Sequence, residues 1–346
     1  MATWTSLQTG FGTGLSVSSF ATDLDDNLYM MDASGDVFEY KISTDTLATI
    51  NTTASMDIDR GIVWFDGNLY MLADQSGSPE VFQWDGTPDS RTSVKTLTAG
   101  KDYWLVEDGT TMVAVCFAAS CAAEYTTDGA SWSSGPNLPG NNFWNGFPQD
   151  IDTRGNEVRI MSGSGGVAQI NKWNSTSWTQ ELSSGSLAFT NEWKTDEDFL
   201  TNARYWNYRG HVPVEHSTDF ITWTEADNAE TGEYTFYLDE YGLFKKTYGV
   251  NGDVGGGGTQ CEFCEYNEVT GLFDVIDTAF SHIYQASTGH TVPLINIPTG
   301  ATSPGTYLVL YSTSFTVWKR SAALSPPATA YGYTHSAGGM PGTVTP

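Results

Sequence analysis

Basic residues are scarce in this chain: 15 Lys and Arg stand against 41 Asp and Glu, for a formal net charge of −26 at pH 7. Charged residues make up only 16% of the chain, below the roughly 25% typical of soluble domains, so the acidity reflects missing Lys and Arg. Binding to nucleic-acid phosphates and attraction to anionic lipid both need clustered basic side chains. We therefore expect neither nucleic acid nor an anionic membrane as a partner.

Long apolar runs are missing as well. No stretch of about 18 apolar residues occurs, so we expect no membrane-spanning helix and no membrane insertion. Residues 1–16 have neither a basic n-region nor an apolar h-region, so we expect no secretory signal there. Hydrophobic residues still make up 39% of the chain and aromatic residues 13%, which favours a folded core over global disorder.

Cysteine is rare: Cys116, Cys121, Cys261 and Cys264 are too few for a disulfide scaffold at this length. The spacings C-x4-C and C-x2-C could supply four thiolates to zinc. However, Cys261 and Cys264 lie in an alternating segment, TQCEFCEY, that is typical of a strand. Residues three positions apart on a strand point to opposite faces. We therefore favour ordinary packed or loosely exposed thiols over a zinc site.

Helical periodicity is nearly absent, and 36 Gly and 13 Pro interrupt the chain throughout. Short alternating segments rich in β-branched and aromatic residues recur instead, bounded by turn dipeptides such as Asp26-Asn27, Asp66-Gly67, Asp108-Gly109 and Gly155-Asn156. These dipeptides favour positive φ and close tight hairpins. The predicted fold class is all-β.

An internal repeat organises these strands. Its unit is an aromatic or His residue, six intervening positions and a large apolar residue, and it starts at 40, 125, 216, 266 and 311, with weaker copies at 84 and 173. Each unit divides into four short strands: 15–21, 27–33, 36–42 and 46–51 in the first, 102–107, 110–118, 123–127 and 130–134 in the third, and 282–287, 291–297, 306–312 and 315–320 in the last. Four antiparallel strands in about 40–45 residues are typical of a β-propeller blade.

The chain thus resembles seven-bladed β-propellers of the broad Kelch and Asp-box kind. One or two β-sandwiches would explain the strands but not the period. Tryptophans at recurring positions are expected to fill the spaces between blades; they are Trp64, Trp104, Trp132, Trp178, Trp223 and Trp318. The expected propeller covers 1–320, with blades at about 14–53, 54–99, 100–140, 141–184, 185–228, 229–279 and 280–320.

Residues 321–346 break the repeat. This segment is rich in Pro, Gly, Ala, Ser and Thr and has no periodic apolar face. We expect an extended or disordered C-terminal arm, ordered by a partner if at all. Because the last predicted blade is complete at Arg320, the arm is free to reach a neighbouring subunit.

Two local motifs, TTDGASW (126–132) and STDFITW (217–223), resemble the Asp-box hairpins of sialidases and related propellers. Both are one residue shorter than the S/T-x-D-x-G-x-x-W pattern, and the second lacks its Gly. The resemblance implies that Asp128 and Asp219 cap peripheral turns while Trp132 and Trp223 pack in the blade. The motif therefore supports the fold and assigns no catalytic residue.

Catalytic patterns are not found. The seven Arg residues include no Arg-Ile-Pro element of the sialidase kind, and G-x-S-x-G and H-E-x-x-H are absent. GDVGGGG (252–258) lacks the Lys and helix of a phosphate loop. The pairs Asp57/Asp59 and Asp150/Asp152 would each project two carboxylates to one face of a strand and are weak candidates for Ca²⁺. Solvated turns are the favoured alternative, so we expect no cofactor.

Three functions remain. The first is a non-enzymatic structural or adhesive component of a virus particle, such as a phage tail, fibre or capsid-surface protein, because short DG-x-x-W hairpins resemble propeller modules of phage structural proteins. Its partners would be other virion proteins, reached through the arm, and cell-surface glycan. The second is a lectin-like propeller that stacks sugars on aromatic side chains. The third is an extracellular glycosidase, which needs two carboxylates at suitable separation. We favour the virion component, with an extracellular location as the alternative.

Overall fold

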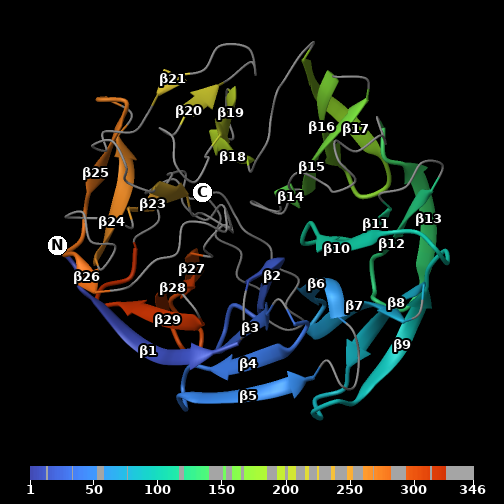
Figure 1. Cartoon of the computed structure of the whole chain (residues 1–346), viewed down its shortest axis with the longest axis horizontal. Coiled ribbons are helices and arrows are strands. Elements are labelled where there is room, and N and C mark those ends of the chain that lie inside the picture. Colours follow the sequence, from blue (N-terminus) through green and yellow to red (C-terminus); the bar gives the residue numbers. More distant parts are fainter. Residues whose placement is uncertain are drawn as a thin grey trace. The chain divides into compact units, whose positions relative to one another are not determined.

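A computed structural model describes most of the strands and the turns that join them (Figure 1). The described residues are 1–12, 15–32, 34–52, 58–75, 77–116, 121–139, 151–152, 158–164, 167–184, 193–198, 202–207, 215–217, 224–225, 235–237, 248–251, 260–267, 269–281, 294–311 and 314–324. They form 29 strands and no helix, which confirms the all-β prediction. Within these ranges no helix is long and apolar enough to cross a membrane.

The strands belong to two compact units, of which the second contains β2 to β17. Its four sheets each consist of four consecutive antiparallel strands. They are β2 (Leu15–Thr22), β3 (Asn27–Asp32), β4 (Val37–Lys41) and β5 (Thr46–Asn51); β6 (Ile58–Phe65), β7 (Asn68–Gln75), β8 (Ser78–Trp84) and β9 (Arg91–Thr96); β10 (Tyr103–Glu107), β11 (Met112–Cys116), β12 (Ala122–Thr126) and β13 (Trp132–Asn137); β14 (Ile151–Asp152), β15 (Val158–Ser164), β16 (Val167–Trp173) and β17 (Trp178–Ser184). The strands predicted for the first and third repeats are confirmed.

The first unit contains β1 and β18 to β29, in three sheets. They are β18 (Trp193–Asp198), β19 (Asn202–Asn207), β20 (Glu215–Ser217) and β21 (Thr224–Glu225); β22 (Thr235–Tyr237), β23 (Tyr248–Asn251), β24 (Gln260–Asn267) and β25 (Leu272–Val275), with β26 (Phe280–Ser281) also pairing with β24; and β27 (Leu294–Ile297), β28 (Gly305–Tyr311), β29 (Phe315–Arg320) and β1 (Trp4–Phe11). The described residues thus form seven sheets, a number compatible with seven blades.

The sequence repeat corresponds to one hairpin in most sheets. Tyr40 pairs directly with Leu47, and Tyr266 pairs with Phe273, across the third and fourth strands of their sheets. The last copy differs: Tyr311 pairs with Phe315, because only residues 312–314 separate β28 from β29. The fourth strand of that sheet is β1, which the repeat assigned to no blade; β1 runs antiparallel to β29. The predicted strand 282–287 lies outside the described residues.

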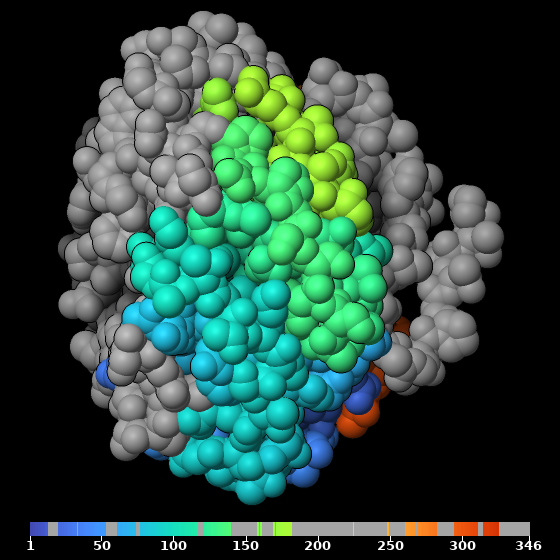
Figure 2. Space-filling model, turned by 90° about the vertical axis from the view of Figure 1, so that its right-hand side faces the viewer, coloured from blue at the N-terminus to red at the C-terminus, as the bar shows by residue number. Residues whose placement is uncertain are grey.

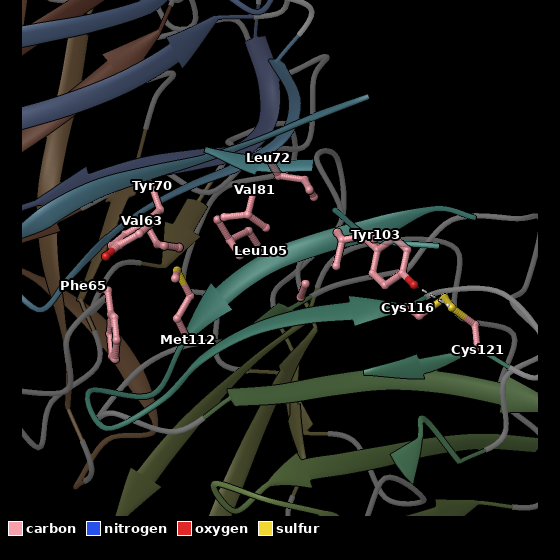
Figure 3. Packing of buried hydrophobic residues seen from close by; sticks show 12 residues of the cluster. Val63, Phe65, Tyr70, Leu72, Val81, Tyr103, Leu105, Met112, Cys116 and Cys121 are labelled. Carbon is pink, nitrogen blue, oxygen red and sulfur yellow. Dashed lines mark hydrogen bonds between the residues drawn. A yellow bond between two sulfur atoms is a disulfide. The ribbon is translucent and has the colours of Figure 1, made fainter. Parts of the chain in front are cut away.

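The core consists of apolar clusters shared by adjacent sheets. One cluster joins β6–β9 to β10–β13 and includes Leu72, Val81, Leu105 and Met112 (Figure 3). Each fully buried side chain of this size contributes roughly 1.5–3 kcal/mol to folding. Five of the six predicted tryptophans are buried in such clusters or packed against them, namely Trp64, Trp104, Trp132, Trp178 and Trp318. Trp223 lies outside the described residues.

The cysteines separate into two kinds. Cys116 and Cys121 form a disulfide between the end of β11 and the start of β12, with the two Cα atoms 5.7 Å apart. This corrects the expectation of four ordinary thiols: antiparallel neighbours bring the strand ends within disulfide range. Cys261 and Cys264 take no part in a disulfide and are buried in β24 as packed thiols. Burial raises the pKa of the Cys261 thiol to about 12, so it stays protonated at neutral pH.

Candidate functional site

The turns of the second unit hold about half of its described carboxylates. Antiparallel order puts the first and third turns of each sheet at the same end of that sheet. Polar contacts also join turns of neighbouring sheets, as between the hydroxyls of Thr110 and Ser175, 3.3 Å apart. We call these first and third turns the acidic turns. Their aspartates are Asp23, Asp25, Asp26, Asp45, Asp66, Asp85, Asp89, Asp108 and Asp128. In Figure 2, β8 to β13 adjoin one another, in blue-green to green, on one face.

Asp128 lies in the turn between β12 and β13, within the Asp-box-like motif. Its Oδ1 accepts hydrogen bonds from the backbone N–H of Ala130 (2.9 Å) and of Ser131 (2.6 Å), and from the Thr126 hydroxyl (2.9 Å). These donors hold the pKa of Asp128 well below its usual range, with the Ser131 N–H contributing most. Trp132, half-buried, packs against the cluster shared with β6–β9. This carboxylate is therefore ionised and committed to the turn.

The same turn touches the neighbouring sheet. Gly129 has φ +71°, and a Cβ built on it would lie 1.9 Å from the hydroxyl oxygen of Tyr70 on β7. Burial raises the pKa of Tyr70, and the charges of Asp66 and Asp128 raise it further. The motif glycine is thus required both by its backbone conformation and by a close approach.

Asp23 and Asp26 organise the first sheet. Asp23 Oδ1 accepts the backbone N–H groups of Asp25, Asp26 and Asn27, each at 2.9 Å. Asp26 is buried, and it accepts the backbone N–H of Ser43 at 2.8 Å and the Ser43 hydroxyl at 2.6 Å. Asp26 therefore joins the β2–β3 turn to the β4–β5 turn.

The β10–β11 turn carries two adjacent carboxyl groups in different environments. Asp108 is buried and its Oδ1 accepts the backbone N–H groups of Thr110 (2.9 Å) and Thr111 (2.6 Å). Desolvation raises the pKa of Glu107 to about 7, although the Gly109 N–H that donates to this carboxylate opposes the shift. Glu107 is therefore the acidic side chain here that changes charge near neutral pH.

The exposed members of the acidic turns present negative charge on rigid backbone. Asp45, Asp66, Asp85, Asp89 and Asp128 are all exposed. Asp45, Asp66 and Asp89 adopt φ values of 51°, 46° and 56°, the left-handed conformation that short polar residues tolerate. Such a surface can attract Lys and Arg side chains of a partner, with a strength that falls as salt increases.

The calcium candidates are not brought together by any described contact. Asp59 lies in β6 and Asp152 in β14, whereas Asp57 and Asp150 lie outside the described residues. Asp219 and Trp223 of the second Asp-box-like motif lie outside them as well. Among the described residues, no group of three His, Cys, Asp or Glu is arranged to hold a metal ion. Calcium binding stays a prediction.

One polar network was missed at the sequence level. Asp277 has a fully buried side chain and accepts the Trp4 indole N–H at 2.9 Å and the Ala2 backbone N–H at 3.2 Å. Arg320 binds both of its oxygens, at 2.7 and 2.6 Å. The network fixes β1 against β29. Nothing local in the sequence marks Asp277, because its partners are at opposite ends of the chain.

Comparison with known proteins shows the fold. No family model matches the chain, and no curated protein matches it in sequence. The WD40 β-propeller domain of Doa1 matches with a TM-score of 0.55 and 10% identity, over 92% of this chain and 97% of that one. YCF48 bound to a D1 peptide matches with a TM-score of 0.52 and 9% identity, over 93% of this chain and 97% of that one. The WD40 domain of Toxoplasma gondii coronin gives 0.50 and 10%, over 95% and 88%. The chain has a β-propeller fold.

Proposed function

We propose that this chain is a non-enzymatic, protein-binding β-propeller that serves as a structural component of a virus particle. The observation that carries the binding role is the set of exposed acidic turns. Their carboxylates sit on turns fixed by local hydrogen bonds, so little conformational freedom is lost when a partner binds. A basic segment of another protein is the complementary partner.

A propeller of similar fold supports peptide binding. YCF48, which shares 9% identity with this chain, is solved in complex with a D1 peptide. A peptide partner is therefore compatible with this fold. The location in a virus particle is supported by the short DG-x-x-W hairpin at 128–132, by the uncharged C-terminal arm and by the lack of a catalytic sequence pattern.

Peptide binding can be tested directly. We would measure binding of Lys/Arg-rich, neutral and Asp/Glu-rich peptides by fluorescence anisotropy at low and high salt. The proposal expects the basic peptides alone to bind, and their affinity to fall with salt. The triple variant Asp45→Asn/Asp66→Asn/Asp89→Asn keeps side chains that tolerate positive φ but removes three charges, and it should bind more weakly.

The matched control removes three charges from the first unit, with Glu262→Gln/Glu265→Gln/Asp274→Asn. It should bind like the original chain. If the two triple variants lose affinity equally, the acidic turns are not the binding surface; if no basic peptide binds at low salt, the binding role is wrong. For the particle, neighbouring genes that encode capsid, portal or tail proteins are expected, and a genome without them would contradict this assignment.

A further inference from the structure

Exposed apolar side chains gather on one hairpin of the first unit. Among the residues whose exposure the structure describes, the large hydrophobics that lie open to solvent are Met1, Val269 (94%), Leu272 (37%) and Val275 (40%). The last three lie within seven residues, in the β24–β25 turn and in β25. We call residues 269–275 the apolar hairpin. Leu272 and Val275, three positions apart on β25, point to opposite faces of the strand, so the apolar hairpin exposes apolar atoms on both of its faces.

The apolar hairpin also has an open backbone edge. β25 is the last strand in the order β22-β23-β24-β25, so one side of it has no strand partner in the described sheet. The single carboxylate of the hairpin, Asp274, accepts a hydrogen bond from the Asn267 side chain at 2.6 Å. An edge strand with exposed apolar side chains is suited to pairing with an added strand.

The described chain ends beside this hairpin. Leu324 donates its backbone N–H to the Thr306 hydroxyl at 2.9 Å. Its side chain packs against the same core cluster as Ile276, the residue directly after β25. Arg320, four residues before Leu324, also binds Asp277, two residues after β25. The 22 residues 325–346 therefore follow a described segment that is anchored near the end of β25. Fully extended, they span on the order of 70 Å, several times the length of a four-residue strand.

The segment 325–346 has the composition of an added strand. It contains no Asp, Glu, Lys or Arg, in a chain whose net charge is −26. Residues 328–340 lack Pro and can donate every backbone N–H, and Tyr331 and Tyr333 would point to the same face of a strand. Two copies of this acidic chain repel each other. Contact through an uncharged segment limits that repulsion.

Two prolines at the start of the segment favour a second copy over the same chain. Ser325 and Pro326 each precede a proline, which restricts both to extended conformations. This sequence pattern disfavours a tight reversal directly after Leu324. An arm that departs in this way is better placed to reach a neighbouring molecule than to fold back onto its own β25.

We infer that residues 325–346 of one copy add a strand to β25 of a second copy, and that the exchange is reciprocal. The apolar hairpin is then a self-association site, and the assembly is a two-fold dimer in which each copy gives one arm and receives one. The inference deepens the proposed structural role and rests on it, because it names a second copy of this chain as one of the protein partners.

Sedimentation velocity over a wide concentration range tests the exchange. The full chain should form dimers, whereas a chain lacking residues 325–346 should remain monomeric. Val275→Asp places a charge on an exposed position of β25 and should weaken dimerisation by on the order of tenfold or more. Thr92→Asp adds the same charge to an exposed position of β9, in the second unit, and should leave the dimer unchanged.

A mixing experiment separates exchange between copies from pairing within one copy. The Val275→Asp chain keeps its arm, and the truncated chain keeps its hairpin, so an equimolar mixture should form a heterodimer that neither forms alone. The inference is overturned if the full chain is monomeric, if the dimer survives truncation, if the two Asp variants behave alike, or if the mixture stays monomeric. Basic-peptide binding by a monomeric chain would contradict the exchange and leave the proposed function standing.

Discussion

Aspartate side chains stabilise two regions of this molecule in different ways. In the acidic turns of the second unit, Asp128 is exposed and accepts N–H groups two and three residues away. Between β25 and β26 of the first unit, Asp277 is buried and binds groups 43 to 275 residues away, in β1, in β29 and at the N-terminus. Each exposed aspartate such as Asp128 stabilises a single hairpin. Asp277 holds a whole strand, so its loss should affect far more of the structure.

The largest effect is expected for Asp277→Asn. The change leaves the Arg320 guanidinium, only 11% exposed, without its counter-charge. Removing one partner of a buried ion pair typically costs about 3–5 kcal/mol. Urea unfolding should show this loss, and hydrogen exchange should show faster exchange in β1 than in β6. A loss no larger than that of a turn variant would mean that the network does not hold β1.

The double variant Asp277→Asn/Arg320→Leu provides the control. It removes both charges, so no unpaired charge stays buried, and part of the lost stability should return. If the double variant is as unstable as the single one, then the loss comes from the hydrogen bonds to Trp4 and Ala2 rather than from the charge on Arg320.

The second largest effect is a pH dependence at Glu107, in the β10–β11 turn. The folded state raises the pKa of this group from 4.5 to about 7. Stability linked to Glu107 is therefore complete below pH 4.5 and declines as the pH rises toward 7, by up to about 3 kcal/mol. Glu107→Gln should remove this decline and be more stable than the original chain at pH 8.

Asp66→Asn is the charge control for Glu107→Gln. It removes one negative charge from an exposed turn position and should leave the decline between pH 4.5 and 7 in place. Melting temperatures of both variants measured across that range test the cause of the decline. Equal pH profiles would show that net charge, and not the desolvation of Glu107, lowers the stability.

Much of the fold follows from the sequence because its signals are local. Dipeptides such as Asp66-Gly67 specify tight turns, and the pairs Tyr40–Leu47 and Tyr266–Phe273 mark third-to-fourth strand hairpins. The role of β1 could not be predicted in this way. Trp4 pairs with Arg320, and no local pattern connects residues that lie so far apart. For the same reason the first predicted blade begins after β1.

The site was predictable to a smaller extent. The Asp-box resemblance pointed to Asp128 and Trp132, whereas the burial of Asp26 and the desolvation of Glu107 depend on packing between turns and sheets. The spacing of Cys116 and Cys121 was equally compatible with thiols, and only the pairing of β11 with β12 decides for the disulfide. Sequence patterns identify turns well; they do not show what covers them.

A smaller loss in the free energy of unfolding, of about 2–3 kcal/mol, is expected for Gly129→Ala. The variant has an unfavourable φ and a Cβ that collides with the Tyr70 hydroxyl. Gly67→Ala is the matched control, because Gly67 has φ +77° but no atom within 4 Å of its Cβ position. Gly67→Ala should lower the free energy of unfolding by about 1 kcal/mol, because it has the unfavourable φ but no collision. Equal losses in urea unfolding would mean that the contact with Tyr70 adds nothing.

The smallest effect is expected for Asp128→Ala. The variant loses a cap that serves one exposed turn, so its melting temperature should fall less than that of Gly129→Ala. Because the folded state lowers the pKa of Asp128 below the ordinary value of 3.8, the contribution of this group is present above that pH and is lost as the pH falls below it. The difference between the original chain and the variant should therefore shrink under acid. If the difference in melting temperature between the original chain and the variant stays constant below pH 3.8, then packing at position 128, and not its charge, stabilises the turn. The contrast between exposed and buried aspartates would then not be a contrast of charge.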